Sequence, residues 1–102
     1  MGLKNGKILA SRDKDILIYE LNEKKKYFKS QSLSRHNELV YALGELEDGT
    51  IISGSKDKKI ILWEEDPNNK QYKIKQVIDT EKEIQIILHN VFVRQQNLQA
   101  LH

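Results

Sequence analysis

The stretch DGTIISGSKDKKIILWE (residues 48–64) decides the fold class of this chain. It opens on Asp48-Gly49, a tight-turn dipeptide, because Asp and Gly both tolerate positive φ. Two short apolar runs follow, at 50–53 and 59–63, and polar residues with a second aspartate, Asp57, separate them. Short apolar runs bounded by turn residues are typical of a β-hairpin.

Six more short runs of the same kind lie outside this stretch. They cover residues 7–11, 15–20, 26–31, 39–43, 72–77 and 83–88. Turn-forming residues separate them, including Asn5-Gly6 before the first of these runs and residues 66–69 before the run at 72–77. Eight short strands with turns between them predict an all-β sandwich, barrel or propeller.

A repeat within the chain distinguishes among these folds. The segment NGKILASRDKDILIYE (residues 5–20) is similar to residues 48–64, with one residue gained between Gly49 and Ser55. A period near 44 residues is the size of one four-stranded propeller blade, whereas a sandwich leaves the repeat unexplained. Three pairs of residues mark the alignment at an offset of 44: Ser11 with Ser55, Asp13 with Asp57, and Tyr19 with Trp63.

The second copy resembles a WD40 repeat. Trp63-Glu64 stands at the place of the family's Trp-Asp, and Arg35-His36 stands at the place of its Gly-His. The resemblance covers residues 5–88 and implies blades of a β-propeller, each an antiparallel four-stranded sheet. It divides the chain into a first partial blade at 5–33, a full blade at 34–78, the start of a third blade at 79–88 and an off-pattern C-terminal tail at 89–102.

The resemblance implies a structural role for His36, for either Ser53 or Ser55, for Asp57 and for Trp63. In the family, the corresponding His, Ser or Thr, Asp and Trp form a hydrogen-bonded chain. The chemistry is sound because an aspartate accepts from an imidazole N–H and a hydroxyl accepts from an indole N–H. Ser, His and Asp together also suggest a catalytic triad, but a triad needs an exposed nucleophile and an oxyanion hole. The repeat points these side chains inward, so we predict a structural network, no catalytic residue and no enzyme.

Composition argues against other kinds of site. Lys and Arg total 17 and Asp and Glu total 15, so the net charge of +2 excludes a strongly basic nucleic-acid arm and an acidic tail. The absence of Cys excludes disulfides and thiolate sites. His89 and His102 lie outside the repeat, and no His, Asp and Glu cluster has metal-ligand spacing. With no Gly-rich phosphate loop either, we predict no metal and no cofactor.

Location and membrane association follow from the apolar pattern. No apolar run approaches the roughly 18 residues of a membrane span. Residues 1–12 contain no apolar signal-peptide core. The absence of Cys fits a reducing compartment, and the resemblance to WD40 repeats implies a cytoplasmic or nuclear protein, for which we predict no membrane partner.

Charges divide between the two faces that a propeller would have. The loops of one face would carry Arg12, Lys14, Arg35, Lys56, Lys58 and Lys59, and those of the other Glu45, Glu47, Asp48, Glu64, Glu65 and Asp66. A basic face suits acidic or phosphorylated peptides, and its candidate binding residues are Arg12, Arg35 and Lys56. Ordinary surface charge is the alternative interpretation.

A second basic cluster, Lys24–Lys26 with Lys29, surrounds Tyr27 and Phe28. Nucleic-acid recognition uses aromatic side chains interleaved with cations on one surface. Strand alternation is expected to send one of the two aromatic residues into the core. We therefore interpret this cluster as a solvated loop and an exposed strand face, and favour that interpretation over nucleic-acid binding.

The length allows about 2.3 blades, whereas closed propellers have four to eight. Three interpretations follow: a fragment of a longer propeller, a chain that assembles with its own copies into a ring, or one that completes another protein's propeller. The abrupt ends favour the first. The predicted function is a non-catalytic WD40-type protein–protein interaction scaffold. Binding of acidic peptides by the basic face is the alternative, and nucleic acid is a weaker one.

Overall fold

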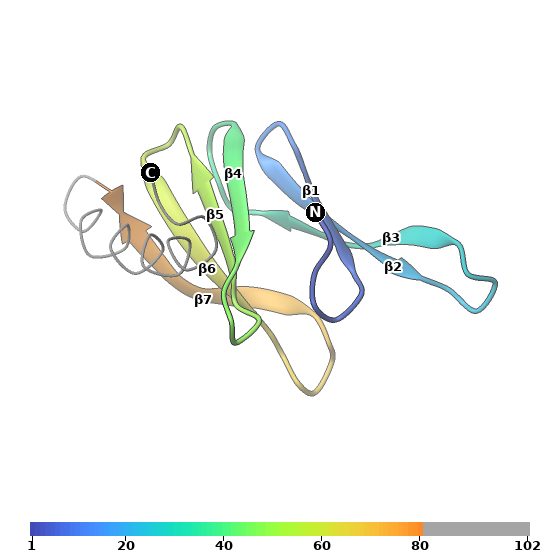
Figure 1. The fold of residues 1–102 in the computed structure, drawn as a ribbon. Coiled ribbons are helices and arrows are strands. Elements are labelled where there is room, and N and C mark those ends of the chain that lie inside the picture. Colours follow the sequence, from blue (N-terminus) through green and yellow to red (C-terminus); the bar gives the residue numbers. More distant parts are fainter. Residues whose placement is uncertain (81–102) are drawn as a thin grey trace, which may run out of the picture.

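The computed structural model describes residues 1–80, which form two antiparallel sheets (Figure 1). The first sheet has the order β1-β2-β3 and the second the order β4-β5-β6-β7. The all-β prediction is confirmed for this part of the chain, and every predicted run within it overlaps a strand. The strands are β1 (Ile8–Arg12), β2 (Asp15–Leu21), β3 (Tyr27–Ser34), β4 (Val40–Glu45), β5 (Ile51–Ser55), β6 (Lys59–Glu65) and β7 (Tyr72–Asp79).

Several predictions at the C-terminal end fall outside the described residues. They concern the strand at 83–88, the off-pattern tail at 89–102 and the two histidines His89 and His102. The boundary predicted between residues 78 and 79 falls inside β7, because Asp79 still pairs with Lys59 in the sheet.

The hairpins β2–β3 and β6–β7 share one register. Each contains a bulge at the same place, before Tyr19 in the first and before Trp63 in the second. The internal repeat therefore continues through β3 and β7, where the sequence shows little similarity. The equivalent cross-strand pairs are Ile16–Leu33 and Ile60–Ile78, Ile18–Gln31 and Leu62–Gln76, and Leu21–Tyr27 and Glu65–Tyr72.

The pairing of the other strands corrects the sequence alignment at one point. Ser11 lies opposite Ile16, and Gly54 lies opposite Ile60, so Ser11 corresponds to Gly54. The alignment of Ser11 with Ser55, and the gain of a residue before Ser55, are wrong. The residue is gained in the β5–β6 turn at 56–58, because a turn absorbs an extra residue without exchanging the two faces of a strand.

Residues 1–3 extend the first sheet beyond β1. Gly2 forms an antiparallel bridge with Ile8, and the N–H of Leu9 donates to the carbonyl of Met1 at 2.8 Å. The turn at Asn5-Gly6 closes this hairpin. The sequence predicts a partial blade that starts at residue 5, whereas the structure places a short pairing segment before it.

The glycine of the β4–β5 turn requires a conformation that other residues adopt with strain. Gly49 has φ +90°, as does Gly6 in the equivalent turn. Replacing Gly49 by alanine should lower the free energy of unfolding by about 1 kcal/mol, although no atom lies within 4 Å of the added Cβ. Urea unfolding followed by circular dichroism measures this. Gly2→Ala, also without a neighbour for the added Cβ, is the control and should change little. An equal effect of the two substitutions would contradict the turn geometry.

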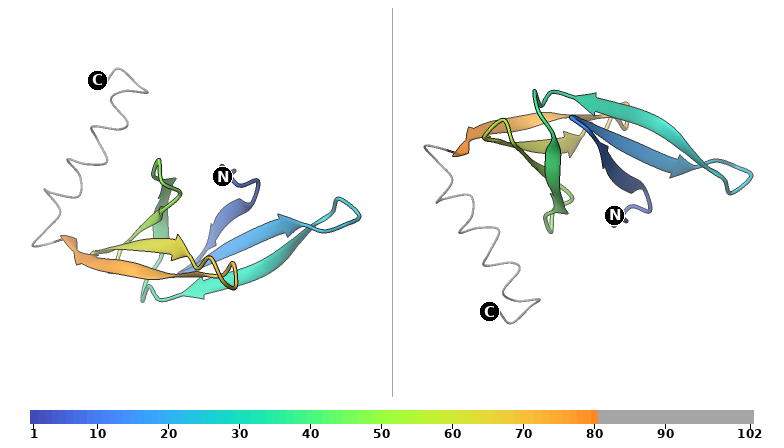
Figure 2. Two further views of the ribbon diagram at one scale, coloured as in Figure 1. Left: turned by 90° about the horizontal axis from the view of Figure 1, so that it is seen from below. Right: turned by 90° about the horizontal axis from the view of Figure 1, so that it is seen from above.

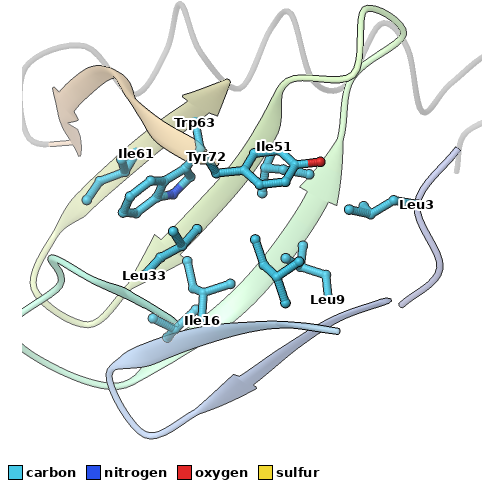
Figure 3. Packing of buried hydrophobic residues seen from close by; sticks show 10 residues of the cluster. Leu3, Leu9, Ile16, Leu33, Ile51, Ile61, Trp63 and Tyr72 are labelled. Atoms are coloured by element: carbon cyan, nitrogen blue, oxygen red, sulfur yellow. The ribbon is translucent and has the colours of Figure 1, made fainter. Parts of the chain in front are cut away.

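The two sheets pack face to face around one core. Figure 3 shows the rings of Trp63 and Tyr72 from the second sheet among aliphatic side chains of both sheets. The first sheet and the residues before it contribute Leu3, Leu9, Ile16, Ile18 and Leu33, and the second contributes Val40, Ile51, Ile61, Trp63 and Tyr72.

The β2–β3 hairpin projects away from the rest of the molecule (Figures 1 and 2). Tyr27 and Phe28 lie near its tip, and their side chains are 49% and 45% exposed. The prediction that one of them enters the core is wrong, because β1 pairs with β2 only as far as Tyr19 and does not reach the tip. The Lys24–Lys26 cluster occupies the exposed turn, as expected for a solvated loop.

Candidate structural network and binding faces

His36 links the β3–β4 connection to the β5–β6 hairpin. Its Nδ1 lies 2.9 Å from Asp57 Oδ2, and its Nε2 lies 2.8 Å from Ser53 Oγ. The indole Nε1 of Trp63 donates to the same Ser53 Oγ at 2.9 Å. Four of the predicted residues thus form one hydrogen-bonded chain from a surface turn into the core, which we refer to as the Asp57–Trp63 network.

One arrangement of protons satisfies every member of this network. The Trp63 N–H donates to Ser53, the Ser53 hydroxyl donates to His36 Nε2, and His36 Nδ1–H donates to the Asp57 carboxylate. The His36 side chain is 1% exposed and that of Asp57 7%. No buried side-chain nitrogen or oxygen of residues 1–80 lacks a hydrogen-bond partner. A fully satisfied buried network of this kind adds rigidity.

Asp57 accepts more hydrogen bonds than His36 alone provides. The backbone N–H groups of Asn37 and Lys59 donate to its two carboxylate oxygens at 3.0 and 2.9 Å. Burial raises the pKa of the Asp57 carboxyl, but the N–H of Asn37 and the imidazole of His36 outweigh burial and hold this pKa below its ordinary value. The charged form of Asp57 is therefore part of the folded structure.

Ser55, the alternative to Ser53, has a different role. Its hydroxyl donates to the carbonyl of Glu38 at 2.9 Å and accepts the N–H of Asp57 at 3.1 Å. Ser55 thus fastens the β5–β6 turn to the β3–β4 connection. Ser53 is the residue within the network.

The first sheet has no equivalent network, because Ala10 and Tyr19 occupy the positions of Ser53 and Trp63. Gln31 of this sheet instead bonds to the second sheet: its Nε2 donates to the carbonyl of Tyr72, and the N–H of Tyr72 donates to its Oε1, both at 2.8 Å. The sequence analysis missed this link. The only sequence signal for this link is that Gln31, a polar residue, lies on the same strand face as the apolar Leu33.

A second polar cluster joins the sheets beside Tyr72. The ammonium of Lys7 lies 2.8 Å from Glu65 Oε2 and 5.3 Å from the centre of the Tyr72 ring, and Asn5 donates to the Tyr72 hydroxyl at 3.0 Å. Burial lowers the pKa of Lys7, but the hydrogen bond and charge of Glu65 outweigh it and raise this pKa overall. The sequence analysis missed this cluster as well, since its members lie far apart in the chain.

The candidate binding residues Arg12, Arg35 and Lys56 lie near one edge of the molecule. The N–H of Val40 donates to the backbone carbonyl of Asp13 at 2.8 Å, and that of Lys56 to the carbonyl of Leu39 at 3.1 Å, so three connections meet there (Figure 1). All three cations are exposed. Within residues 1–80 no carboxylate pairs with any of them. We refer to Arg12, Arg35 and Lys56 as the basic face.

Acidic residues gather at the opposite edge, around a cavity of about 460 Å³. Lys4 bonds to two of them: its backbone N–H donates to the Glu45 carboxylate at 3.0 Å and its ammonium to the backbone carbonyl of Glu47 at 2.8 Å. The acidic lining residues are Glu45, Glu47, Asp48, Glu64 and Glu65.

Two other kinds of site can be examined in the described part of the chain. No group of three or more His, Asp or Glu side chains in residues 1–80 is arranged to hold a metal ion. No helix in the same residues has the length and apolar character needed to cross a membrane.

Comparisons with protein-family models, with curated protein sequences and with solved structures gave no significant match.

Proposed function

We propose that the chain contributes neighbouring WD40-type propeller blades and acts as a non-catalytic protein-binding module. The Asp57–Trp63 network is the observation that supports this most. The residue types that the resemblance marks are far apart in sequence, yet they lie in one hydrogen-bonded chain. They lie in the connection between the two sheets, on the second and third strands of the four-stranded sheet, and in the turn between these strands.

The same geometry argues against a catalytic role. The Ser53 side chain is fully buried, and its Oγ is engaged by His36 and by the Trp63 N–H. A nucleophile must reach a substrate, and this hydroxyl has no exposed surface. The network instead fastens the β3–β4 connection to the β5–β6 turn at one edge, where both can be presented to a partner.

Selection of phage-displayed random peptides on the immobilised full chain tests the protein-binding function. We expect enriched peptides whose binding is lost when the chain is unfolded in urea. Failure to enrich any peptide that distinguishes the folded from the unfolded chain would contradict the proposal.

A second candidate function is binding of acidic or phosphorylated peptides by the basic face. Three exposed cations without a paired carboxylate in residues 1–80 favour it. Reversing all three charges (Arg12→Glu, Arg35→Glu and Lys56→Glu) should weaken binding of a synthetic phosphoserine peptide roughly tenfold or more. Fluorescence anisotropy measures the affinity.

The matched control reverses three lysines on the projecting hairpin, Lys24→Glu, Lys25→Glu and Lys26→Glu. This variant should bind the peptide nearly as well as the wild type, whereas equal losses in both variants would indicate non-specific attraction. A single-stranded DNA probe tests the nucleic-acid alternative, which predicts tight binding that weakens steeply with salt.

A further inference from the structure

The interface between the two sheets is built from unlike faces of a repeated unit. We define the inner face of each sheet as the one that packs on the other sheet. Leu9, Ile16, Ile18 and Gln31 lie on the inner face of the first sheet. Ile51, Ser53, Ile61, Trp63 and Tyr72 lie on the inner face of the second.

Each outer face repeats the residues that the other sheet uses inside. The registers place Ile52, Ile60, Leu62 and Gln76, on the outer face of the second sheet, at the positions of Leu9, Ile16, Ile18 and Gln31. They place Ile8, Ala10, Leu17, Tyr19 and Tyr27, on the outer face of the first sheet, at the positions of Ile51, Ser53, Ile61, Trp63 and Tyr72.

These outer faces are apolar where a solvated antiparallel sheet is polar. Two of the equivalent pairs differ in environment, whereas Ile78, which stands at the position of Leu33 on the outer face of the second sheet, is 0% exposed. Tyr72 is 6% exposed inside the interface, whereas Tyr27 is 49% exposed outside it. Gln31 bonds to the backbone of Tyr72, whereas Gln76 is exposed. The outer face of the second sheet thus resembles the first sheet's half of the internal interface, and the outer face of the first sheet resembles the second sheet's half. Within one chain these two outer faces do not meet.

We propose that the chain binds a second copy of itself head to tail. The outer face of the second sheet of one copy packs on the outer face of the first sheet of the next copy, and so repeats the internal interface. Gln76 then bonds to the backbone of Tyr27 in the neighbouring copy, as Gln31 bonds to Tyr72. This inference rests on the proposed blade identity and names one partner of the module.

Such an interface is heterologous, so each copy has one surface of each kind. This property gives a sharp test with two full-length variants. Tyr19→Glu places a charge on the outer face of the first sheet, and Leu62→Glu does so on that of the second. Both side chains are half-buried and lie outside the shared core, so the sheets should be retained, which far-UV circular dichroism checks.

Sedimentation equilibrium over a concentration series measures association. We expect the wild-type mass to rise with concentration and each variant alone to stay monomeric. An equal mixture of the two variants should form a one-to-one dimer that does not grow, because one intact surface of each kind remains. Self-pairing of like faces would instead leave one variant dimeric alone and give no dimer specific to the mixture.

The two glutamines provide a matched pair that does not place a charge on either outer face. Gln76→Ala should weaken association about tenfold, through the loss of two hydrogen bonds, without changing the urea midpoint of the monomer. Gln31→Ala should lower that midpoint. Equal effects of the two substitutions on association would overturn the assignment of Gln76.

A wild-type chain that is monomeric at every concentration would overturn the proposal, including the case in which the chain's own residues 81–102 cover the second sheet. The two proposals can fail separately. Folded-state peptide binding without association would contradict the head-to-tail interface alone. Association through these faces without any peptide binding would contradict the wider protein-binding function.

Discussion

Replacing Trp63 by alanine should lower the free energy of unfolding by about 3–5 kcal/mol, the usual cost of deleting a buried aromatic side chain. Trp63 is 3% exposed and packs between the two sheets (Figure 3). Domains of ordinary stability unfold with about 5–15 kcal/mol, so the variant should be close to unfolding at room temperature. Far-UV circular dichroism during urea titration is the suitable measurement, because Trp63 is the chain's only tryptophan and its fluorescence is lost.

Two substitutions separate packing from hydrogen bonding at this site. Trp63→Phe keeps an aromatic ring but removes the N–H that Ser53 accepts, and should cost about 1–2 kcal/mol through the bond, with a further loss from the smaller ring. Tyr19→Ala changes the equivalent residue of the first sheet, which lies outside the shared core. If Tyr19→Ala lowered the free energy of unfolding as much as Trp63→Ala does, that result would contradict the packing described.

Replacing Asp57 by alanine should lower the free energy of unfolding by about 2–3 kcal/mol. The substitution leaves His36 Nδ1 and the N–H groups of Asn37 and Lys59 without their acceptor. Asp57→Asn is the matched control, because its amide oxygen keeps part of the acceptor capacity. The asparagine variant should therefore be the more stable of the two in urea titration, and the reverse order would contradict the acceptor role.

Asp57 also gives the stability a defined dependence on pH. Its pKa in the folded chain lies below the ordinary value of 3.8, so the stabilisation is fully present above that pH. It is lost as pH falls through the lower, folded-state pKa. Wild type should therefore lose more stability on acidification than Asp57→Asn. Parallel curves for the two proteins would show that Asp57 is not ionised in the folded chain.

The network residues were implied by the family resemblance of the second repeat copy, and their chemistry agreed with that interpretation. An indole N–H only donates and a turn carboxylate only accepts, so Trp63 and Asp57 suit the two ends of a hydrogen-bonded chain. The strands could be predicted from the sequence as well, because short apolar runs and Asp-Gly or Asn-Gly turns determine them locally. The all-β architecture follows from these local signals.

Other contacts depend on how the sheets meet, which no local pattern describes. Gln31 bonds to Tyr72 and Lys7 to Glu65 only because the first sheet packs on the second. The prediction that either Tyr27 or Phe28 enters the core was wrong for the same reason, since alternation orders the two faces of a strand but does not say what covers either face. Because Ser53 and Ser55 are alike, the sequence alignment also placed the additional residue of the second copy before Ser55. The strand pairing places it in the β5–β6 turn instead.

The places where the two copies differ in length bear on which mutations this chain can accept. The second copy has one more residue in the loop at 66–71 than the first has at 22–26, and another in the turn at 56–58. Insertions at these turns do not change which side chains of a strand point to each face of the sheet. A single codon inserted within β5 would instead exchange the positions of Ile51 and Ile52 and remove Ser53 from His36. We therefore expect length variation among natural variants of this chain to be confined to its turns.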